Sequence, residues 1–182
     1  KTAELWGIDF NEAEQRRWLT EILPRHLPDY DYPDEPSFGA DESAFHTKNS
    51  QFSWLDSRTL FAILREFRPR RMIEIGSGFS SLLTADVNRR FLGDRLELTC
   101  IEPYPRPFLR KGVPGISRLI ESRVQDVPLD TFTCLEAGDV RHGDAVRREV
   151  IVMACHRPAV ARTLEIAQRL GLTPMALDNE PS

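Results

Sequence analysis

The sequence lacks any long apolar run. A membrane-spanning helix needs about 18 consecutive apolar residues, and no stretch of the 182 residues approaches that length. The first residues, Lys1-Thr2-Ala3-Glu4, also do not begin the apolar core of a secretory signal. We therefore expect a soluble, cytoplasmic protein that has no membrane partner.

Cysteine is scarce, and its spacing fits neither disulfide scaffolds nor zinc sites. Cys100, Cys134 and Cys155 are odd in number, far apart and without a C-x-x-C pair. Cys100 and Cys155 fall in apolar, strand-like runs, where a small buried thiol is a common packing choice. No His, Asp and Glu cluster has ligand spacing either. We therefore interpret the cysteines as reduced thiols and expect no metal site.

An excess of positive charge is also absent. Lys and Arg number 24 against 28 Asp and Glu, which gives a net charge of −4. Nucleic-acid partners usually select a basic face, because it releases counterions from phosphate. Local basic clusters at residues 68–71 and 147–148 flank expected strands, and we interpret them as solvated strand ends. A nucleic-acid partner is therefore disfavoured.

Strand-like and helix-like segments alternate through most of the chain. Apolar residues at helical spacing continue to Leu27, and Pro24 and Pro28 are expected to terminate this helix. Turn-forming residues follow to Ser50. Further helices are expected at residues 54–67, 80–91, 127–136 and 158–170. The expected strands cover residues 71–75, 96–101, 117–121, 149–154 and 173–177. This alternation predicts an α/β fold with a doubly wound, mainly parallel sheet of about five strands.

The length favours one domain, since domains usually contain about 100 to 200 residues. We divide it into a helical lead-in and loop (1–50), a ligand-binding half (51–139) and a segment (140–182) that is either a divergent βαβ unit completing the sheet or an appended piece. In an open parallel sheet, ligands bind beyond the carboxyl ends of the strands. The residues directly after each strand are therefore the candidates for a site.

The first two expected strands end in residues suited to bind a nucleoside-containing ligand. Gly76 and Gly78 allow a tight turn and let a ligand lie on backbone N–H groups, and Glu74 places a carboxylate beside that loop. Glu102 follows the second strand. An acid about 20 residues past such a loop accepts hydrogen bonds from ribose hydroxyls.

The third strand is followed by Gln125 and Asp126, which offer an amide and a carboxylate to an adenine edge. Asp126 could equally cap a helix beginning near Pro128. A nicotinamide-binding fold would use the same acid, but Ser81 stands where its fingerprint favours Gly or Ala. A nicotinamide-dependent oxidoreductase is therefore the least favoured reading.

Three segments together resemble a bacterial family of class I S-adenosylmethionine (SAM)-dependent methyltransferases. The similarity covers about Tyr32 to Asp139 and is carried by EIGSGFSS (74–81), LTCIEPYP (98–105) and RVQDVP (123–128). The resemblance implies a Rossmann-like fold, SAM as cofactor and a small-molecule methyl acceptor. It implies that the glycine loop holds the methionine and ribose portion, the acid after the second strand the ribose hydroxyls, and the Gln-Asp pair the adenine. The cofactor-binding residues so implied are Glu74, Gly76, Ser77, Gly78, Glu102, Gln125 and Asp126.

The C-terminal part departs from that family. After Asp139 the chain no longer follows the methyltransferase pattern, and residues 150–181 more closely resemble a stretch of the actin-like type IV pilus-assembly ATPase family. The alternative function is therefore a catalytically inactive nucleotide-binding or assembly module, in a fused or recombined chain. No catalytic residue is assigned. His46 is a candidate general base, although a lone loop histidine is more often polar surface.

Overall fold

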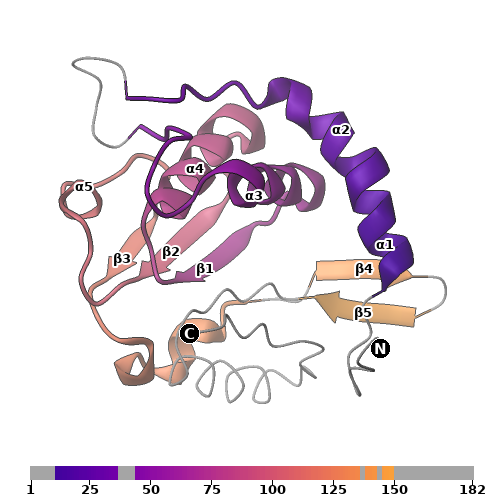
Figure 1. Cartoon of the computed structure of the whole chain (residues 1–182). Helices are drawn as coiled ribbons and strands as arrows, with labels where there is room; N and C mark the ends of the chain where they lie inside the picture. The colour runs from indigo at the N-terminus through magenta and orange to yellow at the C-terminus, as the bar shows by residue number, and fades with distance from the viewer. Residues whose placement is uncertain (1–10, 37–43, 136–137, 143–144, 150–182) are drawn as a thin grey trace, which may run out of the picture.

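A three-stranded parallel sheet forms the centre of the fold. The computed structural model describes residues 11–36, 44–135, 138–142 and 145–149. The strands lie side by side in chain order (Figure 1), and they are β1 (Arg71–Ile75), β2 (Glu97–Ile101) and β3 (Arg118–Ile120). In the register, Arg71 pairs with Glu97 and Ile75 with Ile101. The first three expected strands and a mixed α/β fold are therefore confirmed.

Helices cover one face of this sheet. They are α3 (Trp54–Phe67), α4 (Phe79–Val87), a π-helical turn that continues α4 (Asn88–Leu92) and the short α5 (Pro107–Arg110). Their apolar residues meet the side chains of alternate strand positions, among them Leu98 and Cys100 of β2, both fully buried. Within the described ranges, no helix combines the length and apolarity needed to cross a membrane.

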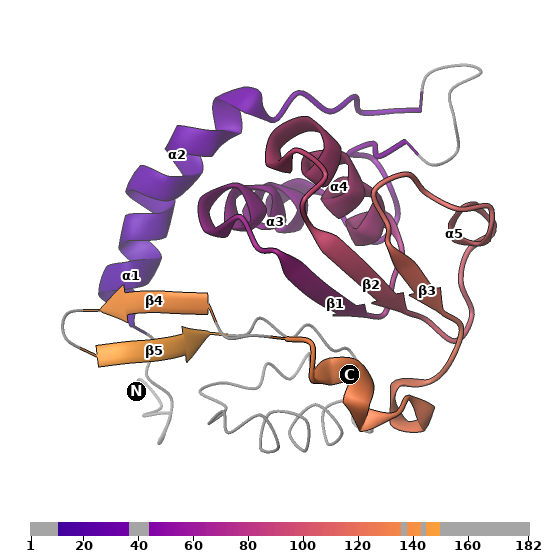
Figure 2. The same cartoon turned by 180° about the vertical axis from the view of Figure 1, so that it is seen from behind.

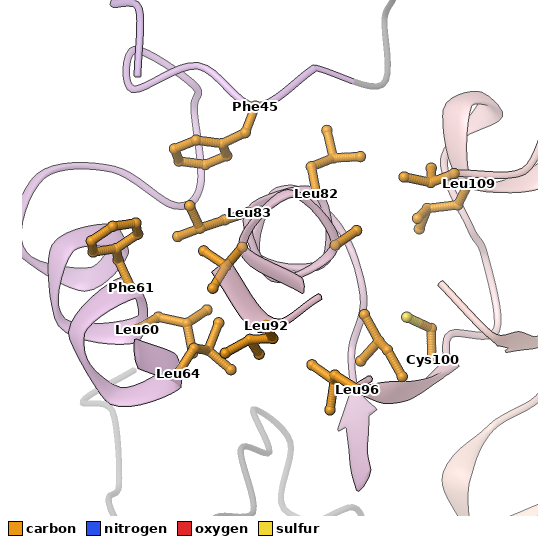
Figure 3. Close-up of a cluster of buried hydrophobic side chains, with 14 of the residues drawn as sticks. Phe45, Leu60, Phe61, Leu64, Leu82, Leu83, Leu92, Leu96, Cys100 and Leu109 are labelled. Carbon is orange, nitrogen blue, oxygen red and sulfur yellow. The ribbon is translucent and has the colours of Figure 1, made fainter. Parts of the chain in front are cut away.

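The main hydrophobic core lies between α3, α4 and the sheet, as Figure 3 shows. The apolar stripe of α3 contributes Leu60, Phe61 and Leu64, which lie on the side of α4 that carries Leu83. Complete burial of such a side chain stabilises the folded state by about 1.5 to 3 kcal/mol. This core therefore fixes α4, and with it the glycine loop from which α4 begins.

The opposite face of the sheet has a smaller apolar cluster. Ile73 and Ile101 pack there against Val124, Val127 and Phe132. These last three come from two 3-10 turns, Val124–Asp126 and Leu129–Phe132, or lie between them. The helix expected at residues 127–136 is therefore wrong. Its sequence is poor in strong helix formers and includes the β-branched Thr131 and Thr133, which favours a single turn.

The N-terminal helical stretch reaches Leu27 as expected, and Pro24 does not interrupt it. It runs through α1 (Glu12–Arg17), a π-helical turn (Trp18–Ile22), α2 (Leu23–His26) and a 3-10 turn (Leu27–Asp29). Pro24 lies in the first turn of α2, directly after the wider π turn, where its missing N–H costs little. Arg25 and His26 both bond to Glu66 of α3, which holds the two helical segments together.

An antiparallel hairpin follows the 3-10 turn Leu129–Phe132, and the sequence pattern did not predict it. Its strands, β4 (Gly138–His142) and β5 (Ala145–Glu149), pair with each other as a separate two-stranded sheet (Figure 2). The segment expected to begin a βαβ unit at residue 140 thus begins inside β4. The described sheet around β1 has three strands. The expected strands at 149–154 and 173–177 lie outside the described residues, apart from Glu149 at the end of β5.

The approach of Gly115 to α4 provides a test of this packing. Gly115 has a φ of +100°, and a Cβ added there would lie 2.7 Å from the carbonyl oxygen of Ala85. Gly112, the matched control, has a φ of +87° but open space around its Cβ position. We expect Gly112→Ala to cost about 1 to 2 kcal/mol of unfolding free energy from backbone strain alone. Gly115→Ala should cost about 2 kcal/mol more in urea denaturation, because the clash adds to the strain. Equal losses would contradict this contact.

Candidate functional site

The glycine loop connects β1 to α4 at the carboxyl end of the sheet. Gly76 has a φ of +83°, a left-handed conformation that glycine adopts without steric cost. Its N–H donates to the Ile101 carbonyl at 2.9 Å, which extends the β1–β2 ladder by one bond. Gly78 is the N-cap residue of α4, and a Cβ added there would meet nothing within 4 Å. The backbone at Gly78 is therefore open to close approach.

Glu102 lies next to this loop, as the sequence predicts. Its backbone N–H donates to the Ile120 carbonyl at 3.0 Å, so the residue continues β2 by one position. Its carboxylate accepts from the Ser77 N–H at 3.2 Å and from the Tyr104 N–H at 2.9 Å. Two residues that are 25 positions apart in the sequence, one from each strand end, are therefore in direct contact.

Gln125 and Asp126 lie beyond the end of β3, in the 3-10 turn Val124–Asp126, and both are exposed. β3 neighbours β2, so the pair follows Glu102 along the same edge of the sheet. The turn at Leu129 has Pro128 as its N-cap and no side-chain cap bond, so Asp126 does not cap it. In the described part of the chain, no hydrogen bond joins this pair to Glu102.

Glu74 points into the protein beneath the glycine loop. It is 3% exposed, and its carboxylate accepts from Ser80 Oγ at 2.5 Å and from Ser81 Oγ. Cys100 Sγ lies 3.7 Å from the same carboxylate. Burial raises the pKa of Glu74, while the bonds from Ser80, Ser81 and Cys100 oppose that rise.

Ser81 connects Glu74 to the loop backbone, a role that the sequence did not reveal. Its hydroxyl donates to Glu74 and accepts from the Gly78 N–H at 2.9 Å. Glu74 therefore restrains the first turn of α4 through the two adjacent serines. Burial, followed by the charge of Glu74, raises the pKa of Cys100 to about 12, so this thiol stays protonated at neutral pH.

His46 lies beside the start of α4. Its ring meets the ring of Phe79 edge-on, with centroids 5.4 Å apart. Its Nδ1 is buried and has no hydrogen-bond partner among the described residues. A buried, unpaired ring nitrogen is costly in free energy.

Two further side chains near the loop were not singled out from the sequence. Arg106 stacks over Phe79, with its guanidinium carbon 5.2 Å from the ring centroid, and donates to Gln51 Oε1 at 2.7 Å. Tyr104 is 73% exposed, and its Oη lies 3.5 Å from Arg123 Nη2. The only available sequence signal was their position shortly after Glu102, at the end of β2.

Of the other three histidines, only His26 has a side chain within the described part of the structure. His26 Nε2 lies 2.9 Å from Glu66 Oε2 between two helices, and hydrogen bonding from His26 lowers the pKa of Glu66. His26 thus has a structural position. For His142 only the backbone of β4 is described, and His156 lies outside the described residues.

Comparison with known proteins shows that the chain is similar to an archaeal protein. The chain is 42% identical over 135 residues to an uncharacterized protein of Archaeoglobus fulgidus; the aligned region covers 73% of this chain and 60% of the relative. The chain thus spans less than two thirds of that relative's length. No protein-family model matches the chain, and no solved structure matches it.

The burial of Glu74 generates a pH-dependence. Because the folded state raises the pKa of Glu74, folding is coupled to the uptake of a proton. The contribution of this protonation to the free energy of unfolding is complete below the ordinary pKa of 4.5. It is lost as the pH rises from there through the raised folded pKa. We expect the unfolding free energy of the parent to fall across this window relative to Glu74→Gln, whose side chain does not ionise.

Urea denaturation of both proteins between mildly acidic and mildly alkaline pH measures this difference. Other titrating groups are common to both proteins and cancel. The control is Glu121→Gln, which removes an exposed carboxylate that pairs with Arg110 and should not reproduce the effect. A parent and a Glu74→Gln variant with parallel pH profiles would show that Glu74 titrates normally in the folded state.

Proposed function

We propose that this chain binds SAM along the carboxyl edge of its parallel sheet and transfers the methyl group to a small-molecule acceptor. The observation that carries the proposal is the contact between the Glu102 carboxylate and the Ser77 N–H at 3.2 Å. This contact links two groups: the glycine loop, whose backbone a ligand can approach closely, and Glu102, whose carboxylate can recognise a diol. The resemblance of residues 32–139 to class I SAM-dependent methyltransferases implies the same pairing.

The order of the groups along the edge agrees with the order of parts in the cofactor. The glycine loop follows β1, Glu102 follows β2, and Gln125-Asp126 follow β3. A ligand lying across the three strand ends would present its amino-acid portion to the loop, its ribose to Glu102 and its adenine to the exposed pair. We propose on this basis that the three strands are half of a Rossmann-like, doubly wound sheet.

Glu102 retains capacity to bind a ribose. A carboxylate has about four lone-pair positions, and the N–H groups of Ser77 and Tyr104 use two of them. These bonds also fix the orientation of the carboxylate before any ligand arrives, which lowers the entropic cost of binding. The exposed ring of Tyr104 lies next to it and offers a flat apolar face to an adjoining base.

The chemistry requires alignment more than activation. The sulfonium of SAM supplies the leaving group, so the protein's task is to hold donor and acceptor in line. Phe79 and His46 adjoin the loop at the start of α4, and the imidazole of His46 is the candidate to accept a proton from an acceptor hydroxyl. Among the histidines whose side chains are described, His46 is thus the best placed candidate base.

The second candidate function is an inactive nucleotide-binding or assembly module. It is favoured by the antiparallel hairpin at residues 138–149, which departs from simple βα alternation. The resemblance to the pilus-assembly ATPase family falls on residues 150–181, which lie outside the described residues. Calorimetric titration with SAM, S-adenosylhomocysteine, ATP and NAD separates this function, and a nicotinamide-dependent one, from methyl transfer.

Gly78→Ala tests the loop without disturbing the fold. The added Cβ meets no protein atom within 4 Å, and the φ of −174° suits any residue, so thermal stability should change little. The methyl group would occupy ligand space, and we expect SAM affinity to fall at least about tenfold. Gly76 is less informative, because its φ of +83° strains any replacement. Unchanged SAM affinity in a stable Gly78→Ala protein would contradict a binding loop.

Glu102→Gln tests recognition of the ribose. Loss of charge-assisted hydrogen bonds should weaken SAM binding by ~1.5 to 3 kcal/mol, measured by calorimetry. The matched control is Glu97→Gln, an exposed carboxylate at the start of β2 on the opposite edge of the sheet, which should bind SAM as the parent does. If both variants lose affinity equally, the effect is one of net charge, and Glu102 does not contact the ligand.

A further inference from the structure

Three arginines surround a small hollow at the end of the sheet opposite the glycine loop. The hollow has a volume of about 80 Å³ and is lined by Arg68, Pro69, Arg70, Leu92 and Arg95. Arg70 directly precedes β1, and Arg95 precedes β2, so both stand at the amino ends of parallel strands. No acidic residue lines the hollow.

The acids nearest in the sequence do not neutralise this cluster. Glu97 pairs with Arg71, whose Nε lies 3.3 Å from the carboxylate. Glu66 of α3 pairs with Arg25 and His26 of α2. Asp94 precedes Arg95 in the chain but is not among the lining residues.

Arg68 occupies a backbone conformation that glycine usually supplies. It is the C-cap residue of α3 with a φ of +48°, and its N–H donates to the Leu64 carbonyl at 3.0 Å. A left-handed conformation costs a residue with a Cβ about 1 to 2 kcal/mol, and glycine is the common choice at such helix ends. Arginine here places a guanidinium at the hollow, where Nη2 donates to the Phe91 carbonyl at 3.3 Å.

We propose that Arg68, Arg70 and Arg95 bind the phosphate of a small phosphorylated molecule. Guanidinium groups match phosphate oxygens in charge and in planar, two-pronged geometry. A hollow of this volume has room for only a few water molecules, which suits a terminal phosphate better than a ring system. The buried Leu92 and the half-buried Pro69 complete the lining of the hollow with apolar surface.

This phosphate site is independent of the proposed SAM site. β1 is five residues long, and at about 3.3 Å per residue the two sites are separated by the length of the strand. The chain's net charge of −4 gives no general attraction for anions, so any phosphate affinity must arise from this local cluster.

Calorimetric titration with methyl phosphate, at constant ionic strength set with chloride, tests the proposal. We expect saturable binding by the parent, about tenfold weaker binding in Arg70→Gln and in Arg95→Gln, and none measurable in the double variant. The control is Arg118→Gln, an exposed arginine at the start of β3 that does not line the hollow. It removes the same charge and should leave the affinity within about twofold of the parent.

Arg68→Gly separates binding from stability. Glycine accepts the φ of +48° without strain, so the melting temperature should stay the same or rise, while affinity for methyl phosphate falls. Absence of saturable binding by the parent would overturn the proposal, as would equal losses in Arg118→Gln and Arg70→Gln. A short DNA duplex that binds through these arginines while methyl phosphate does not would also overturn it, in favour of a nucleic-acid contact. Failure of SAM binding would leave this experiment unaffected, because the titration does not use the glycine loop.

Discussion

Parallel pairing of β1 with β2 determines where the chemically important groups of this chain lie. The register sets Ile75 beside Ile101, and the Gly76 N–H then continues the ladder to the Ile101 carbonyl. One residue further, the Ser77 N–H reaches the Glu102 carboxylate. Because side chains alternate across a strand, a shift of one residue would also reverse the faces of Ile73 and Glu74. The two apolar clusters on opposite faces therefore fix the register on which the candidate site depends.

Glu74 shows how the loop is held from below. A buried carboxyl group is tolerated only where its oxygens find donors, and the hydroxyls of Ser80 and Ser81 provide them. Since Ser81 also accepts from the Gly78 N–H, the start of α4 is tied to the strand that precedes the loop. In this structure the acid supports the shape of the loop, and Glu102 is the carboxylate that lies at its surface.

Much of this arrangement could be predicted from the sequence, because its signals are local. The three sheet strands are short apolar runs, and their expected bounds agree with the observed ones to within about one residue. Proximity of Glu102 to the loop followed from the rule that ligands bind at the carboxyl ends of parallel strands. The partners of Glu74 could not be predicted in this way, since whether a strand-end acid points inward depends on packing against α4.

The hairpin and the N-terminal helix show two other limits of sequence patterns. The strands β4 and β5 contain Asp139, Arg141, Arg147 and Arg148, so they lack the apolar alternation that identifies a strand. Pro24 was expected to end a helix, but the rule assumes regular α-helical bonding. The π turn at Trp18–Ile22 changes which N–H groups are needed, and the helix continues past the proline.

The two ends of the parallel sheet gather different groups of residues, and this follows from the topology. All three strands point the same way, so residues that follow strands gather at one edge and residues that precede strands gather at the other. Acids and the glycine loop occupy the first edge, where the Glu102 carboxylate accepts from the backbone N–H groups of Ser77 and Tyr104. Arginines occupy the second edge, where Arg70 and Arg95 are brought together although 25 positions separate them in the sequence. From the sequence, the basic cluster was interpreted as solvated strand ends. In the folded chain these arginines line a hollow, because parallel pairing places the beginnings of the strands side by side.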